Sequence, residues 1–235
     1  MPPEITSTFI ANWKLDGSRE TAIEWVDKFA SPEGRELIKP DYRLIVAPPL
    51  ELLSFVADKI DAYELPIAVA VQDLNIKFVG VKHTGQAFTP SLVAKLCKLV
   101  ILGHSEKRID DSLTDDYVND QLDAAREHNL EPIVCVSNLE QAEAIFQYDS
   151  NFSDIIAYEP IEFVGTTDSA PAKQANEFCG RLRELFPWAT LLYGGGVDKT
   201  KIKELLLQPF IDGVLIGNRS SGVDFFQNII RALLP

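Results

Sequence analysis

Positively charged residues are scarce in this sequence. Its 235 residues include 22 Lys and Arg against 35 Asp and Glu, giving a formal net charge of -13. Because nucleic acids are bound through basic patches that contact phosphates, this balance argues against a nucleic-acid-binding role. A small anionic substrate is compatible with it only where local positive groups overcome the unfavourable overall field.

Cysteines and long apolar runs are also scarce. Cys97, Cys135 and Cys179 are far apart and form no CxxC pair, which is typical of reduced, buried thiols in a cytoplasmic protein. No basic segment followed by an apolar stretch opens the chain, so we expect no secretory signal. No segment is apolar for long enough to cross a bilayer, and we expect no membrane partner.

The chain shows no linker, low-complexity run or shift in composition that divides it, so we predict one domain over residues 1–235. Short runs rich in Ile, Val and Leu alternate with amphipathic stretches of helical length. The runs that we predict as strands are 8–11, 44–47, 68–71, 99–102, 133–136, 155–158, 190–193 and 213–216. Because they are apolar on both faces, they suit a parallel sheet that helices cover.

This alternation predicts an α/β protein, a (β/α)8 barrel of the TIM type. Eight units average about 29 residues each, the spacing of a compact barrel. The alternative is a doubly wound open sheet, because periodicity does not show that a sheet closes. The lack of a GxGxxG motif after the first strand makes the open sheet less attractive. Helix starts are predicted at Ser18, Pro90, Thr114, Asp198 and Ser221.

Unusual residues follow the predicted strands, where barrel enzymes place their sites. The segments are Asn12-Trp-Lys14, Gly103-His-Ser-Glu-Lys-Arg108, Tyr158-Glu-Pro160, Tyr193-Gly-Gly-Gly-Val197 and Ile216-Gly-Asn218. Taken singly, each has a plainer interpretation: a solvated lysine, a capping histidine, a turn glutamate before proline, or glycines that let the chain turn.

Together these segments place a lysine, a histidine, a glutamate and two glycine-rich turns on one rim. Glycine turns that precede helices expose backbone N–H groups, which bind phosphate together with the helix dipole. A carboxylate base, an imidazole and a fixed cation suit proton abstraction next to a carbonyl. The residues therefore predict proton transfer on a small phosphorylated carbonyl compound.

The same segments, in this order and near this spacing, resemble the signature segments of the triosephosphate isomerases, and the resemblance covers nearly the whole chain. It implies an isomerase that interconverts dihydroxyacetone phosphate and D-glyceraldehyde 3-phosphate, the aldose–ketose step shared by glycolysis and gluconeogenesis. By this resemblance Glu159 would be the base and His104 a neutral electrophile. Lys14 would supply a fixed positive charge restrained by Glu106, and Asn12 would help to hold the reacting oxygens.

The resemblance also assigns the phosphate site. The segment 160–167 corresponds to a loop that closes over the substrate, with Gly165 contacting phosphate. Gly196, Gly217 and Asn218 would add backbone N–H contacts, beside Asn12 and Lys14. No metal or organic cofactor is implied, and the histidines lie far apart at positions 83, 104 and 128.

Several positions depart from the family pattern. Glu162 and Phe163 stand where tryptophan and alanine are usual, Gly196 where serine is frequent, and Asn218 where a second glycine is common. Glu162 is among several features that resemble the shorter archaeal-type enzymes. The departures concern loop closure and phosphate affinity and leave the chemical residues intact.

The segment 79–85 matches a loop that in the family reaches into a neighbouring subunit, so a homodimer is expected, with a tetramer left open. The alternative interpretation is that the segment 79–85 is a solvated surface loop. Two other functions stay open on the residues alone: another sugar-phosphate isomerase, epimerase or aldolase-like barrel, and a catalytically weak barrel that binds a sugar phosphate.

Overall fold

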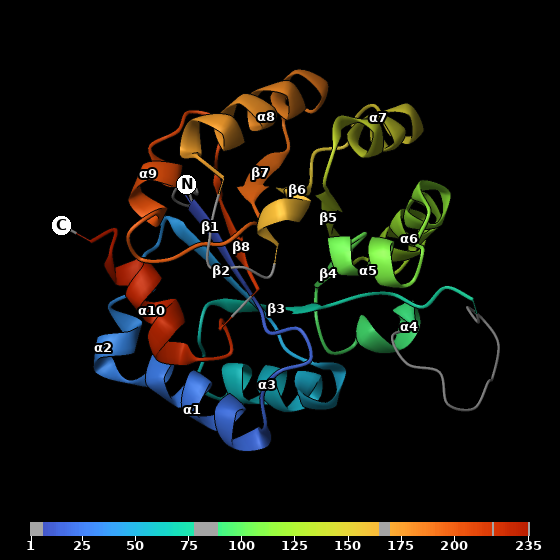
Figure 1. Cartoon of the computed structure of the whole chain (residues 1–235). Helices are drawn as coiled ribbons and strands as arrows, with labels where there is room; N and C mark the ends of the chain where they lie inside the picture. The colour runs from blue at the N-terminus through green and yellow to red at the C-terminus, as the bar shows by residue number, and fades with distance from the viewer. Residues whose placement is uncertain (1–6, 78–88, 165–169, 218, 235) are drawn as a thin grey trace.

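The strands of the chain form one closed barrel. A computed structural model describes residues 7–77, 89–164, 170–217 and 219–234, and within them eight strands pair in sequence order around a ring (Figure 1). The strands are β1 (Ser7–Asn12), β2 (Tyr42–Ala47), β3 (Ile67–Val71), β4 (Leu99–Leu102), β5 (Glu131–Val136), β6 (Ile155–Tyr158), β7 (Thr190–Tyr193) and β8 (Gly213–Ile216).

The pairing of β1 decides between the two architectures that the sequence allowed. Ile10 lies opposite Ile45 of β2 on one side and opposite Leu215 of β8 on the other, and both pairings are parallel. An open sheet would leave β1 or β8 with a free edge at this place. The predicted (β/α)8 barrel is therefore confirmed, and the doubly wound sheet is wrong.

Each strand divides its residues between two apolar environments. One set points into the barrel and fills it: Ile10, Ile45, Ala47, Ala70, Leu99, Ile101, Ile133, Cys135, Ile155, Ala157, Leu192 and Leu215. The residues between them, such as Phe9, Val100 and Val134, face the helices. This period of two explains why the strands read as continuous apolar runs, because neither face reaches water.

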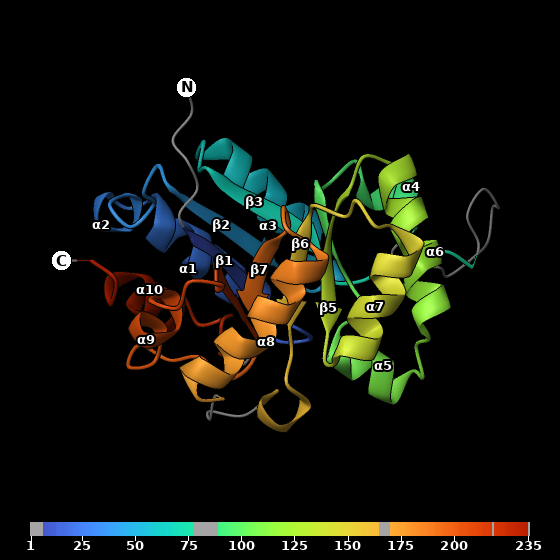
Figure 2. The same cartoon turned by 90° about the horizontal axis from the view of Figure 1, so that it is seen from above.

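Helices cover the outside of the barrel on all sides (Figures 1 and 2). They are α1 (Arg19–Ala30), α2 (Pro32–Arg35), α3 (Leu50–Ala62), α4 (Pro90–Val93), α5 (Ser105–Asp110), α6 (Asp115–Glu127), α7 (Leu139–Tyr148), α8 (Ala172–Leu185), α9 (Ile202–Leu206) and α10 (Val223–Arg231), with a 3-10 turn, η1, at Ile161–Phe163. None of the helices within the described ranges is long and apolar enough to cross a membrane.

The predicted helix starts at Ser18, Pro90 and Thr114 are confirmed. Ser18 and Thr114 cap α1 and α6, because their side-chain oxygens accept hydrogen bonds from backbone N–H groups three residues later. Pro90 is the first residue of α4, where its missing N–H is not needed.

The other two predicted helix starts are displaced. The Asp198 carboxylate accepts hydrogen bonds from the N–H groups of Thr200 and Lys201, which forms a turn, and α9 begins only at Ile202. The Ser221 hydroxyl donates to Asp16, so α10 begins at Val223 without a side-chain cap. Asp198 closes a local turn and Ser221 bonds to a distant residue, and residue type alone indicates neither.

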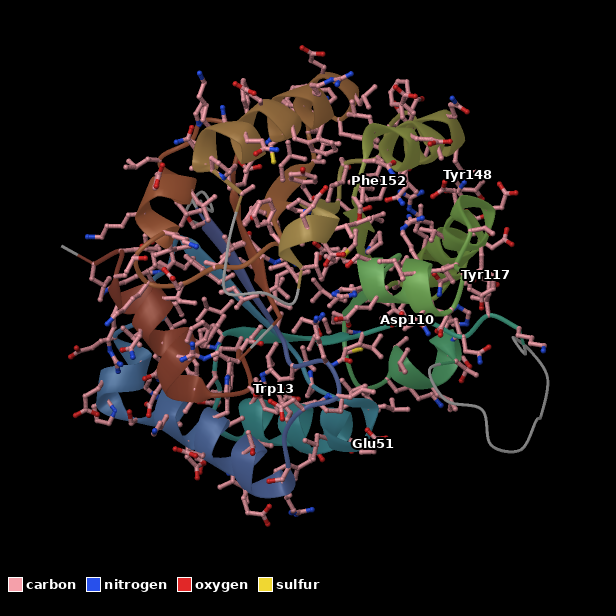
Figure 3. The ribbon with its side chains drawn as sticks, viewed as in Figure 1. Trp13, Glu51, Asp110, Tyr117, Tyr148 and Phe152 are labelled. Atoms are coloured by element: carbon pink, nitrogen blue, oxygen red, sulfur yellow. The ribbon has the colours of Figure 1, made fainter. Side chains whose placement is uncertain are left out.

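The outer layer is joined by side chains that cross between neighbouring helices. Tyr148 of α7 donates its hydroxyl to Asp123 of α6, on the outer surface where these two helices lie side by side (Figure 3). This hydrogen bond to a carboxylate is the main cause that raises the pKa of Tyr148 to about 12.

An aromatic cluster fastens the first and last helices to the barrel. The Trp25 ring of α1 lies 5.7 Å from Trp13, 4.6 Å from Phe29 and 5.8 Å from Phe226 of α10. Trp25 is fully buried, and its indole N–H donates to the carbonyl of Ser220, 3.2 Å away. The cluster therefore joins α1, α10 and the loop after β8 in one packed unit.

We expect Trp25→Ala to lower the free energy of unfolding by about 3–5 kcal/mol, because it leaves a large cavity among rings that cannot collapse into it. Chemical denaturation followed by circular dichroism measures this loss. Trp188→Ala is the matched control, since Trp188 is 83% exposed, and we expect a change within about 0.5 kcal/mol. Equal losses in the two variants would contradict the packing described for Trp25.

Candidate active site

The candidate site lies at the carboxyl ends of the strands. The inward-facing series continues beyond the apolar core: Ile10 is followed at this spacing by Asn12, Ala157 by Glu159, Leu192 by Gly194 and Leu215 by Gly217. Because alternate residues share a face, these groups occupy the mouth of the barrel. Helix α5 and the η1 turn project on the same side of the barrel (Figure 2).

Lys14 is held in a backbone conformation that non-glycine residues rarely adopt, with φ of 55°. Its N–H donates to the side-chain oxygen of Asn12 at 3.0 Å, and its carbonyl accepts from the Gln72 amide at 2.7 Å. Its ammonium group forms an ion pair with Glu106. The surrounding hydrogen bonds thus fix both the backbone and the charged end of this lysine.

His104 is the N-cap of α5, and the turn before it uses Gly103 with φ of 65°. The Nδ1 atom of His104 accepts a hydrogen bond from the Glu106 N–H at 3.3 Å, at the positive end of the helix. An Nδ1 that accepts this bond leaves the ring proton on Nε2, which faces the barrel mouth. The Glu106 carboxylate lies 3.9 Å from Nδ1, beyond hydrogen-bond distance, and binds Lys14 instead.

Glu159 is a carboxylate that is almost wholly buried, with 1% of its surface exposed. Its Oε2 accepts a hydrogen bond from the Ser105 N–H at 2.7 Å, so the contact with Ser105 uses the backbone rather than the hydroxyl. Its Oε1 lies 3.1 Å from Nε2 of His104 and has no hydrogen-bond partner among the described residues. One oxygen is thus anchored, and the other is left available beside the imidazole.

A pocket with an empty volume of about 560 Å³ opens in front of these groups. Residues from several strand ends line it: Lys14, His104, Glu159, Val164, Gly194, Gly195, Gly196, Val197, Asp198, Leu215, Ile216, Gly217, Arg219 and Phe225. Asn12 and Glu106 line a neighbouring groove, which shares Lys14 and His104 with the pocket. Lys14 and His104 therefore stand between the pocket and the groove.

Glycine is required at two positions of the rim, because charged side chains approach the backbone closely there. A Cβ added at Gly194 would lie 2.9 Å from Cγ of Glu159, and one at Gly217 would lie 2.8 Å from Cε of Lys14. A side chain at either position would displace a charged group of the site. Glycine after β7 and β8 therefore leaves room for Glu159 and Lys14.

Tyr193 at the end of β7 ties down the segment that follows β6. Its hydroxyl accepts a hydrogen bond from the Ala170 N–H at 2.8 Å. Burial is the main cause that raises the pKa of Tyr193 to about 12, so this hydroxyl stays protonated at physiological pH. Ala170 comes three residues after the predicted closing loop at 160–167, and the bond fixes Ala170 to the end of β7.

Most of the predicted site residues meet at this mouth. The structure places Asn12, Lys14, His104, Glu106 and Glu159 at or just after the carboxyl ends of β1, β4 and β6, with Gly196 and Gly217 lining the pocket. Gly165 and Asn218, which we also predicted as phosphate ligands, lie outside the described residues. The subunit-bridging loop predicted at 79–85 lies outside them too.

Sequence reasoning missed three polar residues of the site. Gln72 directly follows β3 and bridges the carbonyls of Lys14 and Ala47. Its position after a strand is the same signal that revealed His104 and Glu159. Arg108 packs under Gly103, donates to the Gly103 carbonyl at 2.8 Å and pairs with Asp115 at 2.6 Å, so it supports the turn that carries His104. Arg219 lines the pocket and was not singled out.

A (β/α)8 barrel with this arrangement of carboxylate, imidazole, lysine and glycine turns at its mouth defines a barrel isomerase. The family model described as triosephosphate isomerase matches residues 7–233. The chain belongs to the triosephosphate isomerase family.

Relatives named triosephosphate isomerase match almost end to end. One from Mycoplasma mobile is 34% identical, over 94% of this chain and 98% of its own length. One from Synechococcus sp. (strain JA-2-3B'a(2-13)) is 34% identical over 95% of this chain and 96% of its own. One from Streptomyces coelicolor is 32% identical over 96% and 97%.

The described residues contain no group of three or more His, Cys, Asp and Glu side chains placed to hold a metal ion. The expectation that the enzyme needs no metal or organic cofactor stays a prediction.

The buried thiols give a test of the site's packing. Burial raises the pKa of Cys97 to about 11 and of Cys179 to about 12, and burial together with the Glu159 charge raises the pKa of Cys135. Because the thiolate is the reactive form and all three stay protonated at pH 8, we expect almost no reaction of the folded protein with Ellman's reagent. All three should react in guanidinium chloride. Rapid reaction of one thiol in the folded protein would contradict this packing.

Proposed function

We propose that the chain catalyses the interconversion of dihydroxyacetone phosphate and D-glyceraldehyde 3-phosphate. The observation that carries the proposal is the buried Glu159 carboxylate, whose unpaired Oε1 lies 3.1 Å from Nε2 of His104 at the edge of a pocket lined by Lys14 and glycine turns. A base beside a proton-donating imidazole and a fixed cation suits proton transfer between the two carbons of a hydroxyketone.

Glu159 acts as the base in this reaction. Its carboxylate removes a proton from C1 of dihydroxyacetone phosphate, and the electrons of that C–H bond form the C1–C2 double bond of an enediolate. The negative charge moves onto the oxygen of the former carbonyl at C2. The proton on the C1 oxygen is transferred to the C2 oxygen, and the carboxylic acid then returns its proton to C2 as the C1 carbonyl forms, which gives glyceraldehyde 3-phosphate. To do this, Glu159 releases the Ser105 N–H, and the space left by Gly194 permits the turn.

His104 and Lys14 stabilise the charge that develops on the oxygens. The Nε2–H of a neutral His104 donates to the carbonyl oxygen and relays protons between the two oxygens. Lys14 holds a positive charge near them, Glu106 restrains its ammonium group, and Asn12 fixes its backbone. Because these groups are already oriented, little reorganisation is required when the enediolate forms.

The phosphate binds at the glycine turns after β7 and β8, which line the pocket. Backbone N–H groups at Gly196 and Gly217 contact it, and by the family resemblance Gly165 and Asn218 contribute as well. Closure of the segment 160–167 would exclude water from the enediolate, which otherwise eliminates phosphate. Residue 196 lacks a serine hydroxyl, so the phosphate relies on backbone and charged groups.

Cytoplasmic glycolysis and gluconeogenesis are the setting that we infer for this activity. Three free, buried cysteines support a reducing compartment.

The role of Glu159 is tested by Glu159→Asp and that of His104 by His104→Gln. The first variant retracts the carboxylate by one methylene, and a displacement of this size costs ~100-fold or more in turnover. We expect binding of the substrate analogue 2-phosphoglycolate to change little in both variants. A coupled assay of glyceraldehyde 3-phosphate isomerisation measures turnover, and calorimetry measures binding.

Glu177→Asp is the matched control, because Glu177 is an exposed carboxylate of α8 away from the pocket. Its turnover should equal that of the unaltered protein. A folded unaltered protein that binds 2-phosphoglycolate without turnover would instead favour a catalytically weak binding barrel. Equal turnover in Glu159→Asp and the control would refute the base assigned here.

We also propose that the chain forms a homodimer through the groove beside the pocket. This groove is lined by Lys14, Gln72 and His104 and by Leu15, an apolar side chain that is 90% exposed. Asp110, on α5 where Figure 3 labels it, lines the opposite wall. An exposed leucine next to site residues suits a surface that a second copy covers.

Sedimentation equilibrium at micromolar concentration should give about twice the chain mass of 26.2 kDa. Leu15→Asp should shift the mass toward the monomer, because it places a charge in the covered groove. A fully active monomer would contradict the dimer, and a fourfold mass would indicate the tetramer.

A further inference from the structure

Arg219 is a charged residue of the pocket that the mechanism above does not use. It lies in the loop between β8 and α10 and lines the same pocket as Lys14, His104, Glu159 and Gly217. Its backbone has φ of 69°, in the left-handed region that arginine rarely occupies. Residues held in such conformations cluster where the surroundings fix them for a functional reason.

The surroundings that fix Arg219 come from the next residue. Ser220 is fully buried, and its hydroxyl lies 3.0 Å from the Asn12 carbonyl and 2.9 Å from the Gly217 carbonyl. The Ser220 carbonyl accepts from Trp25. The loop is therefore tied to β1 and α1, and the direction in which the Arg219 side chain leaves it is set.

The guanidinium group of Arg219 is held but not neutralised. It lies over the ring of Phe225, 4.5 Å from the centroid, and Phe225 lines the pocket as well. Stacking uses the flat face of the group and leaves its N–H donors in the plane free. In the part of the chain that the structure describes, no ion pair includes Arg219.

The other charged groups that line the pocket are acidic or already paired, so Arg219 is important for attracting an anion. Glu159 and Asp198 are acidic, and Lys14 is already paired with Glu106. Hydrogen bonds from Thr200 are the main cause that holds the pKa of Asp198 below its ordinary value, so Asp198 stays charged. A phosphate dianion that enters this pocket meets these charges in addition to a net protein charge of -13.

We propose that Arg219 is a substrate-binding residue that donates N–H groups to the phosphate of the triose at the mouth of the pocket. It supplies the charged contact where the loops after β7 and β8 otherwise offer backbone N–H groups. The inference rests on the function proposed above. Its effect is on phosphate recognition and leaves the proton transfer itself unchanged.

Arg219→Gln and Arg219→Lys test this role with two substrates. For Arg219→Gln we expect the KM for glyceraldehyde 3-phosphate and the inhibition constant of inorganic phosphate to rise ~10-fold, because a charge-assisted contact is lost. The kcat should stay within ~2-fold, since the contact is present in ground and transition states alike. Turnover of D-glyceraldehyde, which lacks phosphate, should not change. Arg219→Lys should recover part of the loss, because it keeps the charge.

Arg231→Gln is the matched control, because it removes the same charge from the far end of α10. It should leave both constants unchanged. An unchanged KM and phosphate inhibition in Arg219→Gln, or equal losses with D-glyceraldehyde and the phosphorylated substrate, would overturn the proposal. Should the unaltered protein lack isomerase activity, the proposed function fails, and calorimetric binding of inorganic phosphate to it and to Arg219→Gln still decides the role of Arg219.

Discussion

The closure of a parallel sheet on itself is the constraint on which the rest of this structure depends. Once β8 pairs with β1, no strand has an edge, and every strand is buried on both faces. Polar side chains of the inward-facing series then lie at or near the strand ends, with Arg43 and Glu131 paired at the amino ends. Asn12 and Glu159 lie at the carboxyl ends, where the pocket opens.

Within that mouth, Glu159 is buried at the cost of its hydration and Lys14 is partly buried, and the structure offsets this through fixed partners. Glu106 holds the ammonium group of Lys14, and the first N–H of α5 holds one oxygen of Glu159. The other Glu159 oxygen is left without a partner, although a buried unpaired oxygen lowers stability. A site that retains such an oxygen keeps it ready to accept a proton.

The sequence predicted the strands closely, because segments that are apolar on both faces are stable only when both faces are buried. It also predicted the residues that follow strands directly, such as Lys14, His104 and Glu159. It failed at two helix starts: Asp198 closes a local turn with Thr200 and Lys201, and Ser221 bonds to the distant Asp16, so α9 and α10 begin later. Arg219 was missed because its value comes from the ring of Phe225 and from a backbone conformation, and neither is visible in residue order.

The pairing of β8 with β1 has a consequence for synthesis on the ribosome. The loop after β8 is anchored on Asn12 through Ser220, so the first strand completes its surroundings only after the last strand has emerged. A nascent chain that already contains His104 and Glu159 still lacks Gly217, Arg219 and Phe225, which line the same pocket. Substrate that binds across this final seam would hold the newly closed ring together, and the metabolite would thereby favour the maturation of the chain that converts it.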